Sequence, residues 1–193
     1  MDYQKILESA FKAMGAMAEI NNPYKKGHHK RVAFLSGKIA EEIGIDRDNA
    51  YMIRVAASIH DIGEIAIPVD ILCKVTKLTH IEFILLKEHS EKSFNILKDL
   101  EFPGIVAEIV RQHHERVNGS GYPRGLKDGE TLKAAKILSV ADVFDAITSD
   151  RSYHYAKPVE QALKDIEQGK NVLYDPEVVD TCATLFRDKG LTL

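Results

Sequence analysis

Seven histidine and aspartate side chains constrain the fold of this chain more than any other feature of its sequence. His28 stands four residues before Val32, and Asp142 stands four residues after Leu138, so each extends the apolar stripe of a predicted helix. We therefore expect these polar side chains to point into the core, where several helices bring them together. The set consists of His28, His60, Asp61, His89, His113, His114 and Asp142.

A dinuclear metal site explains this set best. A single inward histidine is more commonly a hydrogen-bonded core residue than a metal ligand. Several unpaired imidazoles and two carboxylates in one core would be costly to bury, and a pair of cations compensates them together. Imidazole and carboxylate suit transition-metal ions, and the set exceeds the ligands of one ion. Metal-assisted hydrolysis is the chemistry that such a site favours.

The assignment of individual residues follows from their positions on the predicted helices. Asp61 directly follows His60 and precedes a turn at Gly63, and we expect its carboxylate to bridge the two ions. We interpret His29 and His80 as surface residues, because neither shares the inward stripe of its neighbours.

The composition favours a single soluble domain. A chain of 193 residues, 45% of them hydrophobic, is long enough to bury one core. The net charge of -3 offers no global attraction to nucleic acid, so we expect no DNA partner. No signal pattern occurs, and no apolar run approaches the ~18 residues of a membrane span. Cys73 and Cys182 show no metal-ligand spacing, so we expect free buried thiols and a cytoplasmic location.

Apolar residues recur at three- and four-residue steps along most of the chain, which predicts an all-α fold. No strand pattern competes. The segment 118–129 holds four glycines and a proline and cannot be helical, so we expect an ordered loop over the site. Helices are predicted over 2–20, 32–43, 48–60, 81–97, 105–114, 134–148, 159–169 and 176–187.

The predicted N-terminal helix, within residues 1–22, precedes a domain that we place at 23–193. This amphipathic helix could be a linker or signalling helix that joins an upstream sensor domain or a second copy of the chain, or it could pack on its own domain. We favour the second interpretation, because its stripe is too short for a sustained heptad pattern.

Five motifs in order give the chain a clear resemblance to a known family. They are YKKGHHKRVA at 24–33, HDIGEIAIPVDILCK at 60–74, LKEHS at 86–90, HHERVNGSGYPRGL at 113–126 and ADVFDAITSDRSY at 141–153. With these motifs the chain resembles the HD-GYP branch of the HD-domain phosphohydrolases from residue 24 to residue 176. The resemblance implies an HD-domain helical bundle of the bacterial cytosol. It also implies a metal-dependent phosphodiesterase that opens cyclic di-GMP to linear pGpG and in some members continues to GMP.

The ligand pattern of the family falls on the same seven residues. Members with three metals carry a glutamate one helical turn before the first histidine, where this chain has Tyr24, so we expect two ions. Iron is the metal most associated with the family, and manganese is the alternative. The GYP residues Tyr122 and Pro123 are implied to bind substrate, and Arg151 and His154 to contact phosphate. A packed turn and a salt bridge at a helix end are the alternative interpretations of the GYP residues and of Arg151.

Two departures from the family pattern remove positive charge. Glu64 replaces the lysine of HDIGK, and His154 replaces an arginine or lysine. We count the Glu64 position, together with Asp61, among the catalytic ones. We therefore expect weakened phosphate binding and a gain of activity in Glu64→Lys. Asn118 replaces an aspartate and should keep the hydrogen-bonding shape of its loop. We interpret a group of basic residues near the first motif mainly as a solvated face: Lys25, Lys26, Lys30 and Arg31.

Three functions remain open from the sequence. The leading one is hydrolysis of cyclic di-GMP. The second is a catalytically weakened domain that acts as a cyclic-dinucleotide sensor or a partner-binding module. The third is hydrolysis of another cyclic dinucleotide or nucleotide. A homodimer is also open from the sequence.

Overall fold

The computed structural model describes residues 3–100, 105–151 and 155–193 and confirms the predicted all-α class for them. Two isolated β-bridges, Asn118 with Lys127 and Lys170 with Tyr174, accompany the helices. The longer helices are α1 (Tyr3–Glu19), α2 (His28–Ile43), α3 (Arg47–Ile59), α5 (His80–Leu97), α6 (Ile105–Gln112), α7 (Lys133–Thr148), α8 (Val159–Gln168) and α9 (Pro176–Arg187). Short turns are η1 (Pro23–Lys25), η2 (Ile62–Ala66), α4 (Val69–Leu72) and η3 (Asp128–Glu130).

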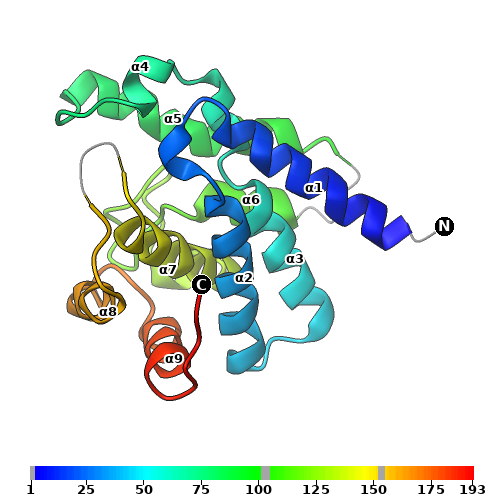
Figure 1. Ribbon diagram of the computed structural model, residues 1–193, viewed down its shortest axis with the longest axis vertical. Coiled ribbons are helices and arrows are strands. Elements are labelled where there is room, and N and C mark those ends of the chain that lie inside the picture. The colour runs from blue at the N-terminus through cyan, green and yellow to red at the C-terminus, as the bar shows by residue number, and fades with distance from the viewer. Residues whose placement is uncertain (1–2, 101–104, 152–154) are drawn as a thin grey trace.

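The core forms where α2 packs between α3 and α7, with α6 against α3 and α7. In Figure 1, α4 and α5 lie at one end of this group and α8 and α9 at the other. Leu35 and Ile39 on α2 are fully buried, as are Ile109 on α6 and Phe144 on α7. Phe144 stacks on Phe186 of α9 with ring centroids 4.4 Å apart. The apolar stripes read from the sequence therefore meet in one core.

The N-terminal helix α1 packs on α3 and η2 with one of its faces. Phe11 and Ala18 are buried on that face, whereas Ile6, Leu7 and Met17 are about half exposed. The domain boundary between residues 22 and 23 stays a prediction. None of the helices in the described ranges combines the length and the apolar character that crossing a bilayer requires. Both cysteines are free thiols, as predicted; Cys182 is buried and Cys73 only partly so.

The GYP loop is ordered, as predicted, and a buried carboxylate fixes it. Glu115 accepts hydrogen bonds from the backbone N–H of Arg124 at 2.7 Å and of Leu126 at 2.9 Å. The backbone packs so closely at Gly121 that a Cβ there would lie 2.5 Å from the backbone of residues 114–116. The Asn118 side chain accepts a hydrogen bond from the Ser120 backbone N–H at 3.0 Å, which is the loop role expected of an amide at this position.

Candidate metal centre

The structure brings the seven predicted ligands together around Asp61. Asp61 Oδ1 lies 3.4 Å from His89 Nε2 and 3.8 Å from His113 Nε2. The other oxygen, Oδ2, lies 3.1 Å from His60 Nε2 and 3.6 Å from His28 Nε2. The two oxygens of one carboxylate therefore face two different pairs of imidazoles.

These contacts divide the ligands into two groups. The ligand atoms of Asp61, His89, His113 and His114 lie within 4.8 Å of one another, and those of His28, His60 and Asp142 do the same. Asp142 Oδ1 lies 3.3 Å from His28 Nε2 and 3.7 Å from His60 Nε2. Asp61 stands between the groups, with one carboxylate oxygen facing each of them.

Hydrogen bonds orient the imidazoles so that Nε2 faces the cluster. Nδ1 of His60, His89 and His113 lies 2.8, 2.7 and 2.5 Å from a backbone carbonyl of the preceding turn. An N–H donated by Nδ1 leaves a lone pair on Nε2, which is the arrangement of metal-binding histidines. Nε2 of His28 and of His60 is buried, lies 3.1–3.7 Å from carboxylate oxygens of Asp61 and Asp142, and makes no well-aligned hydrogen bond with them. Because unpaired buried nitrogens are costly, this donor set fits a metal centre.

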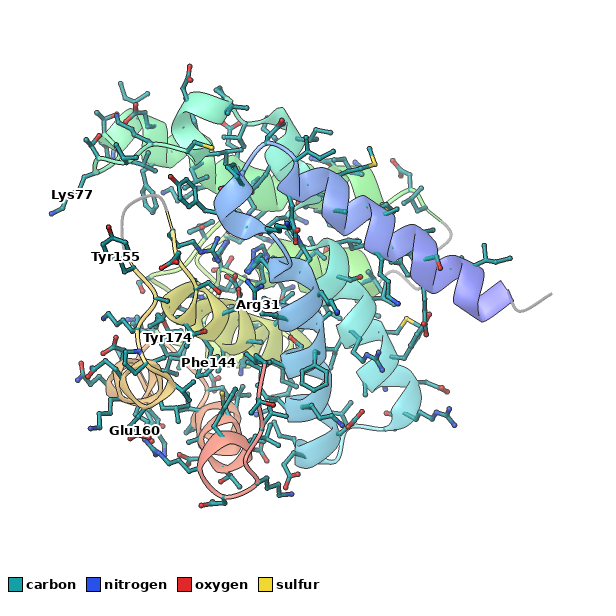
Figure 2. All side chains as sticks on the ribbon, in the orientation of Figure 1. Arg31, Lys77, Phe144, Tyr155, Glu160 and Tyr174 are labelled. Atoms are coloured by element: carbon teal, nitrogen blue, oxygen red, sulfur yellow. The ribbon has the colours of Figure 1, made fainter. Side chains whose placement is uncertain are left out.

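A carboxylate that the sequence interpretation missed completes the support of His28. Asp145 Oδ2 lies 2.7 Å from His28 Nδ1, and Arg31 donates to both Asp145 oxygens. The Arg31 side chain on α2 reaches Asp145 on α7 (Figure 2) and is 30% exposed, so it is partly buried in an ion pair and not freely solvated as the sequence suggested. Asp145 stands one helical turn after Asp142 on α7, and that spacing was the available signal.

Asp145→Asn is expected to weaken metal binding without unfolding the domain. The amide keeps the shape of the side chain but loses the charge that orients and polarises the His28 ring. Loss of such a supporting group typically costs about 10–100-fold in metal affinity. Competition with a chelator measures this directly, and an unchanged affinity would show that the charge of Asp145 does not support the His28 ligand.

Burial and the carboxylates give the imidazoles opposite protonation tendencies. Desolvation opposes protonation of His60, but the nearby carboxylates outweigh it and raise the pKa of His60 to about 10. The pKa of His28 is raised by the same balance. Desolvation lowers the pKa of His113 to about 3 and places the pKa of His114 well below its usual value. In the absence of bound cations, protons on His28 and His60 therefore neutralise the carboxylates.

Metal binding is therefore expected to release protons and to strengthen as pH rises. An ion must displace the protons held by His28 and His60, whose pKa values are raised, so the effect covers the range below about pH 10. For each displaced proton, the logarithm of the association constant should rise by about one per pH unit. Chelator competition with Mn²⁺ at several pH values between about 6.5 and 8.5 measures the slope. A flat profile would mean that both rings are neutral before binding.

His29 is buried, contrary to the sequence prediction of a surface residue. Only 3% of the residue is exposed, because α1 covers the side of α2 that carries it. Its Nε2 lies 3.8 Å from Asp61 Oδ2. His80, which was interpreted in the same way, is exposed.

A cavity of about 660 Å³ opens beside the cluster, and Asp61, His114 and Asp142 contribute to its wall. Of the residues expected to bind substrate, Tyr122 and Arg151 line the cavity, and Pro123, which follows in the loop, does not. His154 lies outside the described residues. The cavity has the size of small-ligand sites in general.

Glu64 and Lys25 share the wall of this cavity. Lys25 Nζ lies 2.8 Å from Glu64 Oε1 and also contacts Asp61 Oδ2, and the Lys25 side chain is only 12% exposed. The sequence interpretation of Lys25 as a solvated residue is therefore wrong. The ammonium group of Lys25 therefore lies beside Glu64, which occupies the lysine position of the family motif.

Comparisons with known proteins agree with this geometry. A family model described as HD domain matches residues 12–178. This chain belongs to the HD domain family. The relatives include a Thermotoga maritima protein named "Cyclic di-GMP phosphodiesterase", 41% identical over 189 residues, which are 97% of this chain and 51% of the relative. The resemblance to the HD-GYP branch is thereby confirmed.

Further comparisons support the same family. A Vibrio cholerae relative named "3'3'-cGAMP-specific phosphodiesterase 3" is 34% identical over 171 residues, 89% of this chain and 37% of the relative. This chain thus spans 51% of the length of the first of these relatives and 37% of the second. The solved structure of "Bd1817, a HDG"Y"P protein from Bdellovibrio bacteriovorus" matches with a TM-score of 0.72 at 22% identity, covering 96% of this chain and 60% of that one, and shows the shared fold.

Proposed function

We propose that this HD domain is a two-metal phosphodiesterase that hydrolyses cyclic di-GMP to linear pGpG. The observation that carries the proposal is the position of Asp61, whose oxygens face two separate imidazole groups. The names of the relatives support the substrate class, since two of them are called phosphodiesterases of cyclic dinucleotides. A bacterial cytosolic location belongs to the same proposal. The domain limits of 23–193 stay a prediction from the motifs alone, and α1 outside them contacts the site through Glu19. An upstream sensor domain or a homodimer stays a prediction.

The proposed metal ligands are divided between two sites that share Asp61. His28, His60 and Asp142 would hold one ion, and His89, His113 and His114 would hold the other. Iron is the first candidate, and manganese is the second. When bound there, such a pair of ions would supply a water of lowered pKa and positive charge for the phosphoryl oxygens. No protein nucleophile is required, so the remaining residues of the site bind and orient the dinucleotide.

An aromatic surface on the cavity wall is suited to a guanine base. The Tyr122 ring lies against the His114 ring with centroids 4.6 Å apart, and Phe83 meets Tyr122 edge to face at 6.3 Å. Lys87 Nζ lies 5.2 Å above the Phe83 ring. Aromatic faces stack on bases at a gain of about 1–3 kcal/mol per base. The GYP tyrosine would therefore hold a base beside the ion bound by His114.

Two cations are placed to bind the phosphates. Arg151 Nε is buried without a hydrogen-bond partner in a residue that lines the cavity, so a phosphate oxygen could accept from it. Lys25 supplies the second charge, because Glu64 and Asp61 hold its ammonium group at the same wall. The site thus retains a cation beside Glu64, which supports the enzymatic proposal over the catalytically weakened sensor.

Lys25→Met is expected to weaken substrate binding while leaving both ions in place. Loss of a charge-assisted hydrogen bond costs about 1.5–3 kcal/mol, so KM should rise about 10- to 100-fold. Glu64→Lys alone should also reduce activity, contrary to the expectation from sequence, because it sets two ammonium groups side by side. The double variant Lys25→Met/Glu64→Lys should recover much of the loss. The exposed neighbour Lys26 offers the control Lys26→Met, with kinetics like wild type.

A turnover assay on anaerobically prepared, iron- or manganese-loaded protein tests the function itself. Cyclic di-GMP, 3'3'-cGAMP and cyclic di-AMP are offered separately, and products are identified by chromatography. We expect linear pGpG from cyclic di-GMP. Preferred cleavage of 3'3'-cGAMP would support the mixed dinucleotide as substrate, the candidate that the Vibrio relative favours. Absence of hydrolysis at full metal occupancy would overturn the enzymatic proposal.

A further inference from the structure

His29 has the same local arrangement as the proposed metal ligands, although it belongs to neither of their two groups. Its Nδ1 lies 3.0 Å from Glu19 Oε1, and its buried Nε2 has no hydrogen-bond partner. Nε2 lies 3.8 Å from Asp61 Oδ2, and the ring centroid lies 4.9 Å from that of His60. The ligand atoms of His29, His60 and Asp61 all lie within 4.8 Å of one another.

An ordinary core histidine does not explain this arrangement. A structural imidazole in the core pairs both nitrogens, and a buried unpaired nitrogen costs about 1–3 kcal/mol. Here one nitrogen is paired, and the other is aimed at the carboxylate that stands between the two ligand groups.

Glu19 fixes the ring from the end of α1. Its carboxylate accepts hydrogen bonds from the backbone N–H of Gly27 at 2.8 Å and of His29 at 3.1 Å, besides the contact with the His29 ring. A carboxylate on the far nitrogen is the usual support of a metal-binding histidine, since it sets the tautomer and increases the basicity of the ligand. Glu19 is accordingly a positioning residue and no ligand.

We propose that His29 is an additional metal ligand on the side of Asp61 that faces His28 and His60. This inference rests on the proposed two-metal function. The ion on that side would then have five protein ligands, whereas the ion beside His89 would have four. Transition-metal ions of this kind take about six ligands in octahedral sites, so the second ion keeps more free positions.

The test is a metal titration of the full chain, because it needs no substrate. Chelator competition with Mn²⁺ gives two dissociation constants for wild type. His29→Ala should raise one of them at least about tenfold and leave the other nearly unchanged. Glu19→Gln, which keeps the imidazole and weakens its support, should give a smaller change of the same constant. His80→Ala removes an exposed histidine and should match wild type.

Two results would overturn the inference. If folded His29→Ala binds both ions with wild-type affinity, His29 has only a structural role. The same conclusion follows if the substitution lowers the melting temperature of the metal-free protein and leaves both metal affinities unchanged. X-ray absorption of the iron-loaded protein gives a second readout, since His29→Ala should lower the number of imidazoles per iron. Asp61→Ala in the same titration separates the proposals. If that variant loses its ions and His29→Ala does not, only the role of His29 fails; if it retains both ions, the two-metal site fails.

Discussion

Asp61→Ala is expected to empty the metal centre and to abolish hydrolysis. Both Asp61 oxygens face imidazoles, and the nearest Nε2 atoms on the two sides lie 3.1 and 3.4 Å away. Removal of this carboxylate takes one ligand from each ion and leaves two cations beside each other without the anion between them. We expect the metal content to fall from about two ions per chain to less than one, and turnover to fall to background. Elemental analysis and the cyclic di-GMP assay measure the two effects.

Two further variants make this result interpretable. Asp61→Asn keeps the volume of the side chain and loses its charge, so it should lose the ions even where the alanine variant folds poorly. Asp99→Ala removes an exposed aspartate outside the cluster and should retain both ions and full activity. Two tightly held ions in either Asp61 variant would refute the bridging role.

Gly63→Ala is expected to lower the free energy of unfolding more than any of the other substitutions proposed above. A Cβ at this position would lie 2.3 Å from the His89 carbonyl oxygen and 2.5 Å from the Ser93 backbone nitrogen, and neither backbone can yield cheaply. The Gly63 N–H also donates to Ser93 Oγ at 2.8 Å. Overpacking costs about 1–3 kcal/mol, and we expect the upper end of this range here. For a chain of this size, about 3 kcal/mol lowers the melting temperature by roughly 6–12 °C.

The same substitution should reach the metal centre, because Gly63 lies two residues from Asp61 and holds η2 against the helix of His89. Metal affinity should therefore fall together with stability. Gly129→Ala is the matched control, since its Cβ would meet no atom within 4 Å and should change neither property. If Gly63→Ala melts like wild type, the close contact between η2 and α5 is not rigid.

The fold could be predicted well where one periodic pattern decides the structure. The apolar stripe from Val32 to Ile43 predicted α2, and the four glycines of the 118–129 segment predicted the loop. The inward positions of His28 and Asp142 followed from four-residue spacing alone. Short turns such as η1 and η2 carry too few residues for a visible period, so the sequence did not show that Lys25 turns toward Glu64.

The site residues that the sequence analysis missed owe their positions to contacts between segments far apart in the chain. His29 follows His28 by one position, and successive residues on a helix point about 100° apart. The sequence therefore places His29 off the inward stripe, and only the packing of α1 over that side of α2 buries it. Asp145 lies in a helix that is buried on several sides, and its partner Arg31 is 114 residues away, so no local pattern joins the two.

The hydrogen bonds of Glu19 bear on how the protein should be produced for study. A version trimmed at residue 23 would look reasonable from the motifs, which begin at residue 24. Trimming would remove the acceptor of the Gly27 and His29 N–H groups and would uncover the surface beneath Phe11 and Ala18. The family match itself begins at residue 12, inside α1. Low metal loading in such a shortened version would therefore reflect the missing helix, and would say little about the intact protein.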